Sequence, residues 1–230
     1  GVSIVIASRG RKALESTAEE LSRETGSSII GVVADTGSDD SVQNLIGEAK
    51  NILSGVDILV NSAARPGGQG TVPTLSEITT DEFNDHMNVK VMGYLRCARE
   101  VAPLMAKQRW GRIINISGMA SRNSGTVVGS MRNVAVTAMT KNLADELGPL
   151  GINVTVVHPG MTRTEATEGV IARRAQSTGL SEAEVEHQMA QVNSVKTIID
   201  ASDIAYVVTM LASPRSIAIN GDVIAAGGGV

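Results

Sequence analysis

The sequence predicts a doubly wound α/β fold, in which helices cover both faces of a parallel sheet. Short apolar runs alternate with longer helical patterns along the whole chain, and this alternation requires right-handed crossovers between parallel strands. Aromatic residues make up only 2% of the chain, so Ile, Val, Leu, Ala and Met must fill the core, as is typical of buried parallel strands. A chain of 230 residues can bury one large core, and we expect a single domain over 1–230.

Six apolar runs are expected to be strands, because they are short, rich in β-branched residues and bounded by turn residues. They span 2–8, 28–35, 56–61, 112–117, 152–158 and 222–227. Helical periodicity predicts helices between them. These lie at about 11–25, 38–54, 81–107, 130–148 and 202–212.

The region 162–195 breaks this rhythm with a polar, charged and mostly helical insertion between two strands. Insertions above the carboxyl ends of strands usually cover the ligand crevice. We therefore expect 162–195 to be a substrate lid within the domain. The alternative is a solvated excursion on the surface.

Charge and composition exclude several classes of partner. The net charge of −4 leaves no basic field for nucleic acid or an anionic membrane. Cys97 is the single cysteine and is expected to be a buried structural thiol, so no disulfide is possible. No apolar run approaches the roughly 18 residues of a membrane span, and we expect a cytoplasmic protein without a metal site. The chain opens on Gly1, so a targeting signal upstream of it would not be visible.

Five motifs stand in a fixed order along the chain. They are VDILVNSAARP (56–66), DEFNDHMNVKVMG (81–93), GRIINISG (111–118), LADELGPLGINVTVVHPGMTRTE (143–165) and INGDVIAAGGG (219–229). Each is weak alone, but in this order and at these spacings the chain resembles the short-chain dehydrogenase/reductase family from Gly1 to Val230. The resemblance implies a Rossmann-type dinucleotide-binding domain and oxidoreductase ancestry.

The beginning of the family pattern is missing. Members start with a strand, a glycine-rich turn and a helix, and that turn presents backbone N–H groups to the cofactor pyrophosphate. No Gly-x-x-x-Gly-x-Gly occurs in this sequence. The missing strand would lie in the middle of the sheet, where its loss would leave backbone unpaired. We therefore expect the first βα unit to be missing from the sequence rather than from the protein.

The end of the first strand favours NADP(H) over NAD(H). In dinucleotide folds an acidic residue here binds the ribose 2′-hydroxyl, whereas an Arg favours the 2′-phosphate. Ser8, Arg9 and Arg11 occupy this neighbourhood, and no carboxylate does. The alternative is that both arginines only solvate a helix start, although cations are slightly unfavourable there.

The resemblance implies further cofactor-binding residues. Asp35 and Thr36 would touch the adenine, and Asn61 and Ala63 of NSAA would line the cofactor, with Ala64 standing where the family has Gly. The HPGMTRT segment would border the nicotinamide through Pro159, Gly160, Thr162 and Thr164.

The catalytic set of the family is largely absent. The family uses a Tyr, a Lys four residues later, a Ser at the preceding strand end, and an Asn on the previous long helix. Asn88 matches the Asn. An ungapped count from NISG to LADELGPLG places the Ser position at Gly118, the Tyr at Met131 and the Lys at Ala135.

Met131 and Ala135 would share one apolar helix face, and neither can donate a proton. General acid catalysis contributes roughly 10² to 10⁴ in rate, so ordinary family turnover is not expected. Ser130 and Arg132 flank Met131 and are possible substitutes, while Ser117 should point to the opposite face of its strand. His158 is either an acid or base near the cofactor or a satisfied structural histidine.

Two functions follow. The chain is either an NAD(P)-binding oxidoreductase by descent with an atypical or impaired proton-transfer site, or a non-catalytic nucleotide- or ligand-binding regulatory homologue. Both imply a small-molecule ligand. The family pairs the helices at 81–107 and 130–148 into dimers and tetramers, and VAVTAMTKNLADEL is apolar on more sides than one core contact needs. We therefore expect a homodimer or homotetramer.

Overall fold

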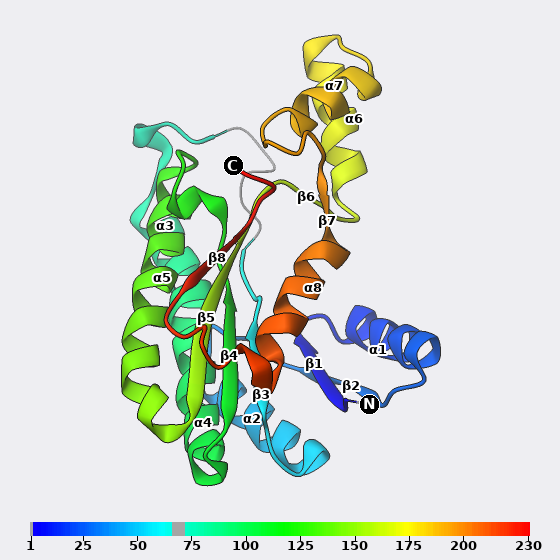
Figure 1. The fold of residues 1–230 in the computed structure, drawn as a ribbon. Helices are drawn as coiled ribbons and strands as arrows, with labels where there is room; N and C mark the ends of the chain where they lie inside the picture. Colours follow the sequence, from blue (N-terminus) through cyan, green and yellow to red (C-terminus); the bar gives the residue numbers. More distant parts are fainter. Residues whose placement is uncertain (1, 66–71) are drawn as a thin grey trace.

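A computed structural model describes residues 2–65 and 72–230. Gly1 and residues 66–71, which include the last residue of the 56–66 motif, lie outside the described residues. The fold is of the α/β type that the sequence predicts, with parallel strands between layers of helices (Figure 1). No helix in the described part of the chain is both long enough and apolar enough to cross a membrane.

The larger sheet has four parallel strands in the order β3–β4–β5–β8. They are β3 (Ile58–Asn61), β4 (Gly111–Ile116), β5 (Ile152–Pro159) and β8 (Val223–Ala226). The two central strands, β4 and β5, are buried almost throughout, so apolar residues predominate on both their faces. This explains their continuous rather than alternating hydrophobic runs.

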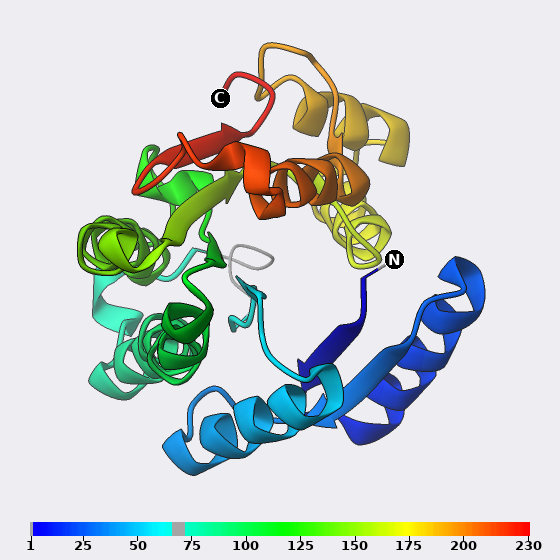
Figure 2. The same cartoon turned by 60° about the horizontal axis from the view of Figure 1, so that its bottom comes forward.

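A second, two-stranded parallel sheet is formed by β1 (Ile4–Ser8) and β2 (Ile29–Val33). It is separate from the larger sheet, and Figure 2 shows the blue β1–β2 pair apart from the green and red strands. Ile4 on β1 and Val60 on β3 are 40% and 44% exposed. A further βα unit that would pair between β1 and β3 stays a prediction.

The two sheets are joined through helix packing. Helix α1 (Arg11–Thr25) packs on β2, and helix α2 (Asp39–Leu53) packs against α4 (Gly93–Gln108). One hydrophobic cluster includes Val42 of α2, Val101 of α4 and Ile113 of β4. Arg96 of α4 donates to Asp39 of α2 at 2.8 Å, which fixes the end of β2 relative to α4.

The helix expected at 81–107 is divided into three segments. They are α3 (Thr80–His86), the π-helical segment η2 (Met87–Met92) and α4. Inserting a π-turn adds one residue to a helical turn, and such segments are frequent at functional sites. The π-turn changes which side chains of this helix face the sheet.

Helices cover both faces of the larger sheet (Figure 2). On one face Tyr94 of α4 and Val136 of α5 (Val127–Leu147) pack with Val156 of β5. On the other, Leu211 of α8 (Ala201–Ala212) packs with Val157. Short 3₁₀ turns complete the fold at η1 (Leu75–Glu77), η3 (Met119–Ser121), η4 (Gly148–Leu150) and η5 (Pro214–Ser216).

The insertion at 162–195 begins with β6 (Thr162–Arg163) and contains α6 (Thr167–Thr178) and α7 (Glu182–Ala190). Strand β7 (Ile199–Asp200) follows it and pairs with β6 in a small parallel sheet. The helices of the insertion share their own hydrophobic cluster, in which Ile171, Val185 and Met189 are nearly fully buried. Figure 1 shows them projecting beyond the sheet at the top of the molecule. The helical character is as predicted, and the role as a lid stays a prediction.

Candidate functional site

The carboxyl end of β4 and the first half of α5 face each other. Gly118 follows this strand end, and Asn133 of α5 is only 6% exposed. A Cβ atom added to Gly118 would lie 3.0 Å from Nδ2 of Asn133 and 3.8 Å from its Cγ, with no other atom within 4 Å. Asn133 is therefore the α5 residue that faces Gly118.

This geometry corrects the assignment of Met131 and Ala135. Met131 is 50% exposed, and two residues along an α-helix rotate a side chain by about 200°. The ungapped count assumed an unchanged loop length between Gly118 and α5. A shift of two residues moves the Tyr and Lys positions to Gly129 and Asn133, which lie one turn apart on the face towards Gly118.

Lys90 of η2 completes this cluster. Its Nζ donates to Oδ1 of Asn133 at 2.9 Å and to the carbonyl oxygen of Ser117 at 3.1 Å. The side chain is 3% exposed. Burial, together with the positive charge of Arg132, lowers the pKa of Lys90 to about 7. Sequence reasoning missed this residue, although a lysine inside the apolar run VKVMGY was a signal.

Asn88 does not join the cluster, contrary to its assignment as the relay residue. Its amide nitrogen donates to the carbonyl oxygen of Gly37 at 3.1 Å, and its Oδ1 accepts from Arg96 at 2.9 Å. Asn88 and Lys90 are two residues apart on this helical segment, so their side chains point in different directions. As a result the family's Asn-bearing helix presents a lysine to Ser117 and Asn133.

The other expected substitutes have different neighbours. Arg132 is buried and donates to the carbonyl oxygen of Arg65 at 3.0 Å and contacts Nδ1 of His86 at 2.6 Å, so it is directed towards α3. Ser130 lies near the loop before α5, since a Cβ on Gly125 would be 3.6 Å from its hydroxyl. The Ser117 hydroxyl donates to the carbonyl oxygen of Asn133 at 3.1 Å.

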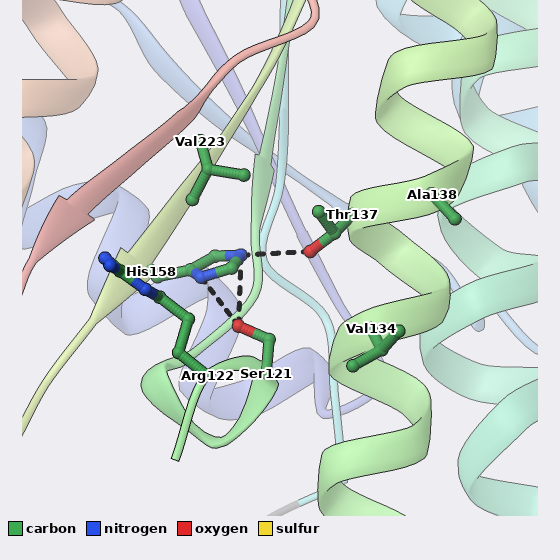
Figure 3. Close-up of a pocket in the computed structure, with 7 residues that line it drawn as sticks. All are labelled: Ser121, Arg122, Val134, Thr137, Ala138, His158 and Val223. Carbon is green, nitrogen blue, oxygen red and sulfur yellow. Dashed lines mark hydrogen bonds between the residues drawn. The ribbon is translucent and has the colours of Figure 1, made fainter.

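His158 lies in a neighbouring cavity of about 500 Å³ between α5 and β8 (Figure 3). Its Nδ1 is 2.7 Å from Ser121 Oγ, and its Nε2 is 3.1 Å from Thr137 Oγ1. Burial, followed by the charges of Arg122 and Lys90, lowers the pKa of His158 to about 4. His158 is therefore neutral near pH 7 and satisfied by two hydroxyls, as the structural interpretation predicted.

The expected adenosine-binding residues lie just at or beyond strand ends. Ser8 and Arg9 are exposed at the end of β1, and Arg11 pairs with Glu15 at 3.3 Å. Asp35 Oδ1 accepts from the backbone N–H of Gly37 at 2.9 Å. The Thr36 hydroxyl donates to the carbonyl oxygen of Val89 at 3.1 Å, which ties the β2 loop to η2.

Asn61 braces the larger sheet. It is buried and donates to Oδ1 of Asn115 at 2.9 Å, while the Asn115 amide donates to the Thr140 hydroxyl at 2.9 Å. This chain of bonds links β3, β4 and α5. Ala63 and Ala64, which follow β3, are exposed, so the chain just after this strand is accessible from outside.

The HPGMTRT segment turns sharply after β5. Gly160 packs on Gly227, and a Cβ at position 160 would lie 2.7 Å from the Cα of Gly227, so only glycine fits. Pro159 ends the strand. The Thr162 hydroxyl donates to the carbonyl oxygen of Gly160 at 3.1 Å, and the backbone N–H of Thr164 donates to Thr167 Oγ1 at 2.8 Å.

Metal ligation has no matching cluster in the described ranges 2–65 and 72–230, where no group of three or more His, Cys, Asp or Glu side chains is suited to a metal ion. The polar groups nearest Gly118 include the Lys90–Asn133 pair. A buried ammonium that donates to an amide oxygen can polarise that amide. Neither group resembles the acidic hydroxyl that family chemistry uses.

Comparison with known proteins places the chain in a class. A family model described as enoyl-(acyl carrier protein) reductase matches residues 1–230. The chain belongs to the short-chain dehydrogenase/reductase family, a family of oxidoreductases.

An uncharacterised oxidoreductase of Staphylococcus aureus (strain USA300) is 32% identical over 170 residues, covering 73% of this chain and 70% of that protein. L-sorbose reductase from Gluconobacter frateurii, solved with NADPH and L-sorbose, has a TM-score of 0.92 at 22% identity, covering 100% of this chain and 87% of that one. A variant of the actinorhodin polyketide ketoreductase, solved with NADPH, has a TM-score of 0.90 at 25% identity and covers 99% and 87%. The fold is therefore that of the reductases.

Proposed function

We propose that this protein binds a nicotinamide dinucleotide, NADP(H) in preference to NAD(H), at a family site whose tyrosine-dependent proton transfer has been lost. It is an oxidoreductase by descent with an atypical or impaired proton-transfer site. One observation carries the second part: the α5 face opposite Gly118 carries Gly129 and Asn133, where a Tyr and a Lys would be needed.

Neither tyrosine of the chain offers a replacement. Tyr94 is buried and donates its hydroxyl to the carbonyl oxygen of Ile116 at 2.9 Å. Burial raises its pKa, so it is a poor acid. Tyr206 is 75% exposed on α8, which packs on the opposite face of the sheet from α5. Neither phenol is therefore suited to the family's proton transfer.

The NADP(H) preference is supported by the end of β1. Arg9 is exposed there and has no ion-pair partner among the described residues, which leaves it available to a phosphate. Helix α1 begins after Gly10 without a side-chain cap and without an acidic residue in its first turn. The positive N-terminal end of a helix favours an anion. The related ketoreductase that was solved with NADPH supports the same cofactor class.

The second candidate is a binding or regulatory homologue that holds a nucleotide or another ligand without turnover. The lack of an acidic hydroxyl at Gly118 favours it. The two candidates share the cofactor and differ in hydride transfer. They are separated by titrating the full-length protein with NADPH and NADH, then following NADPH oxidation across a panel of ketones and aldehydes. Saturable binding with no oxidation selects the second candidate.

Arg9→Ala tests the cofactor assignment. Losing a charge-assisted hydrogen bond of about 1.5–3 kcal/mol should weaken NADPH binding by roughly 10- to 100-fold and leave NADH binding unchanged. The matched control is Arg23→Ala, which removes the same charge from the last turn of α1. Calorimetry gives both affinities. An equal loss for NADPH and NADH would contradict a 2′-phosphate contact.

Self-association is proposed through α5. Val127, Met131 and Val134 are each about half exposed, and they lie within two turns on one side of the helix. An apolar stripe of this kind is typical of an intersubunit contact. Light scattering at micromolar concentration should give a dimer or tetramer mass, reduced to the monomer mass by Val134→Asp. A monomer mass for the unaltered protein would contradict the proposal.

A further inference from the structure

Lysine and asparagine have exchanged helices in this site. The family carries its Lys on the helix corresponding to α5 and its Asn on the preceding long helix, whereas here Asn133 lies on α5 and Lys90 on η2. The two side chains still meet, with Nζ of Lys90 2.9 Å from Oδ1 of Asn133. The site therefore retains both residue types but presents the amide, not the ammonium, towards Gly118.

The Lys90 contact fixes the orientation of the Asn133 amide. An ammonium has only donors, so the atom that it contacts at 2.9 Å must be the amide oxygen. The NH₂ group then points the other way, towards Gly118, where an added Cβ would be 3.0 Å from Nδ2. Asn133 thus directs two donor hydrogens at the end of β4.

Those hydrogens have no acceptor among the described residues. In that part of the chain, Nε of Arg132 is the one side-chain nitrogen or oxygen that is fully enclosed and lacks a partner. Nδ2 of Asn133 also makes no hydrogen bond within 2–65 and 72–230. A donor that is oriented by a buried cation and has no partner among these residues is suited to an acceptor from outside the chain.

Gly118 provides the space. Its φ of 163° is extended backbone that any residue can adopt, so the conformation does not demand glycine. The restriction is steric, because the atoms within 4 Å of an added Cβ belong to Asn133. A Ser here would press against the amide, and the absence of a side chain leaves room for a ligand oxygen.

We propose that Asn133, polarised by the Lys90 ammonium, is the hydrogen-bond donor that holds the oxygen of a small carbonyl compound in front of Gly118. The inference rests on the proposed function, since it names the ligand class of that site. Asn133 would touch the ligand, and Lys90 would act through it as a positioning residue. Preorganised donors of this type are worth far more in a water-excluded site than in water.

Lys90 gives this donor a pH dependence. The charged or titratable groups that act on it are Arg132 of α5 and His158 of β5, and His86 of α3 contacts Arg132. Tyr94 of α4 bonds the carbonyl oxygen of Ile116. Burial lowers the pKa of Lys90 to about 7 and that of His158 to about 4, and it raises the pKa of Tyr94. Burial also lowers the pKa of His86 below its ordinary value of 6.5. Lys90 is therefore the group of this set whose pKa lies near 7, and Asn133 loses its polarisation when Lys90 loses its charge.

The probe is ethyl acetoacetate isotope-labelled at its ketone carbon. Its carbon resonance moves downfield when the oxygen accepts a hydrogen bond, so NMR of the full-length protein reports the contact without turnover. We expect a downfield shift on binding that decreases as the pH rises through about 7. The side-chain amide resonances of Asn133 should titrate over the same range.

Asn133→Asp keeps the shape and the Lys90 contact but removes both donor hydrogens. It should abolish the downfield shift and weaken ketone binding by about tenfold. Lys90→Met keeps the side-chain length and should reduce the shift and abolish its pH dependence. Asn142→Asp is the matched control, because Asn142 is exposed on the same helix and donates only to the carbonyl oxygen of Ala138.

An unchanged shift in Asn133→Asp, or no ketone binding by the unaltered protein, would overturn the inference. If Asn133→Asp fails to fold, the loss of pH dependence in Lys90→Met decides in its place. NADPH titration in parallel separates the two proposals. A ketone shift without NADPH binding would contradict the proposed function and support Asn133 as the hydrogen-bond donor. NADPH binding without a ketone shift would support the proposed cofactor and contradict the role of Asn133.

Discussion

The two halves of the site differ in how they are built. On the dinucleotide side, the side chains of Thr36 and Asp35 bond backbone atoms of Val89 and Gly37, and Asn61 links the strands from inside the core. On the proton-transfer side, Lys90 and Asn133 meet across two helices at Gly118. The first half depends on strand ends, which a sequence pattern locates well. The second half depends on which side chains of two helices face Gly118. A shift of two residues in the alignment assigns different side chains to that face.

The largest expected effect comes from restoring the family's Ser, Tyr, Lys and Asn in the proton-transfer half of the site. The variant combines Gly118→Ser, Gly129→Tyr, Asn133→Lys and Lys90→Asn. NADPH-dependent reduction of ethyl acetoacetate should rise by about 10² to 10⁴, the usual contribution of general acid catalysis. The change in NADPH absorbance measures it.

The control places Tyr and Lys at the positions of the ungapped count, with Gly118→Ser, Met131→Tyr and Ala135→Lys. Because Met131 is half exposed and turned away from Gly118, no gain is expected. A gain as large as that of the first variant would show that the wrong helix face had been chosen. In the first variant a Cβ at 129 would lie 2.5 Å from the Thr126 hydroxyl that caps α5, so a cost of about 1 kcal/mol in stability is expected.

Most of the fold follows from the sequence. The runs at 112–117 and 152–158 correspond closely to β4 and β5, because a strand buried on both faces is mostly apolar and does not alternate strictly with polar residues. The helix at 11–25 is found with the predicted bounds. The π-turn at Met87–Met92 was not predicted, since helical periodicity does not distinguish a π-turn from a regular turn over so few residues.

The site was predicted only in part, for a related reason. His158 was recognised as a possible structural residue, but its partners Ser121 and Thr137 come from a turn and a helix that no local pattern connects to it. Lys90 was missed because a lysine in a helix is usually solvated. Its burial is a tertiary property, created by the approach of Asn133 and Ser117.

The second prediction concerns stability above pH 7. Lys90 has a pKa of about 7 in the folded protein, against an ordinary lysine value of 10.5. Between these values the unfolded chain binds more protons, so the free energy of unfolding should rise with pH, by at most about 5 kcal/mol. Below about pH 7 both states carry the proton, and this contribution stays constant.

Lys90→Met should flatten that rise, as measured by urea denaturation at several pH values. Lys141→Met is the matched control, because Lys141 is exposed and pairs with Asp145 at 2.6 Å on the surface of α5. It should keep the slope of the unaltered protein. If both variants keep it, the rise comes from another group, and Lys90 does not have the lowered pKa that the proton-transfer half requires.

The smallest expected effect is at His158, and it occurs in a different pH window. A folded pKa of about 4, below the ordinary histidine value of 6.5, means that the unfolded chain binds more protons between these values. Stability is therefore fully present above about pH 6.5 and falls by up to roughly 3 kcal/mol as the pH drops to about 4. His158→Gln should remove this acid sensitivity and leave NADPH affinity unchanged, because His158 is bonded to Ser121 and Thr137 rather than to the strand ends that would hold the cofactor. Denaturation curves below pH 6.5 test the acid sensitivity, and calorimetry tests the NADPH affinity. A loss of NADPH binding in His158→Gln would show that His158 belongs to the cofactor site and is not only a structural residue.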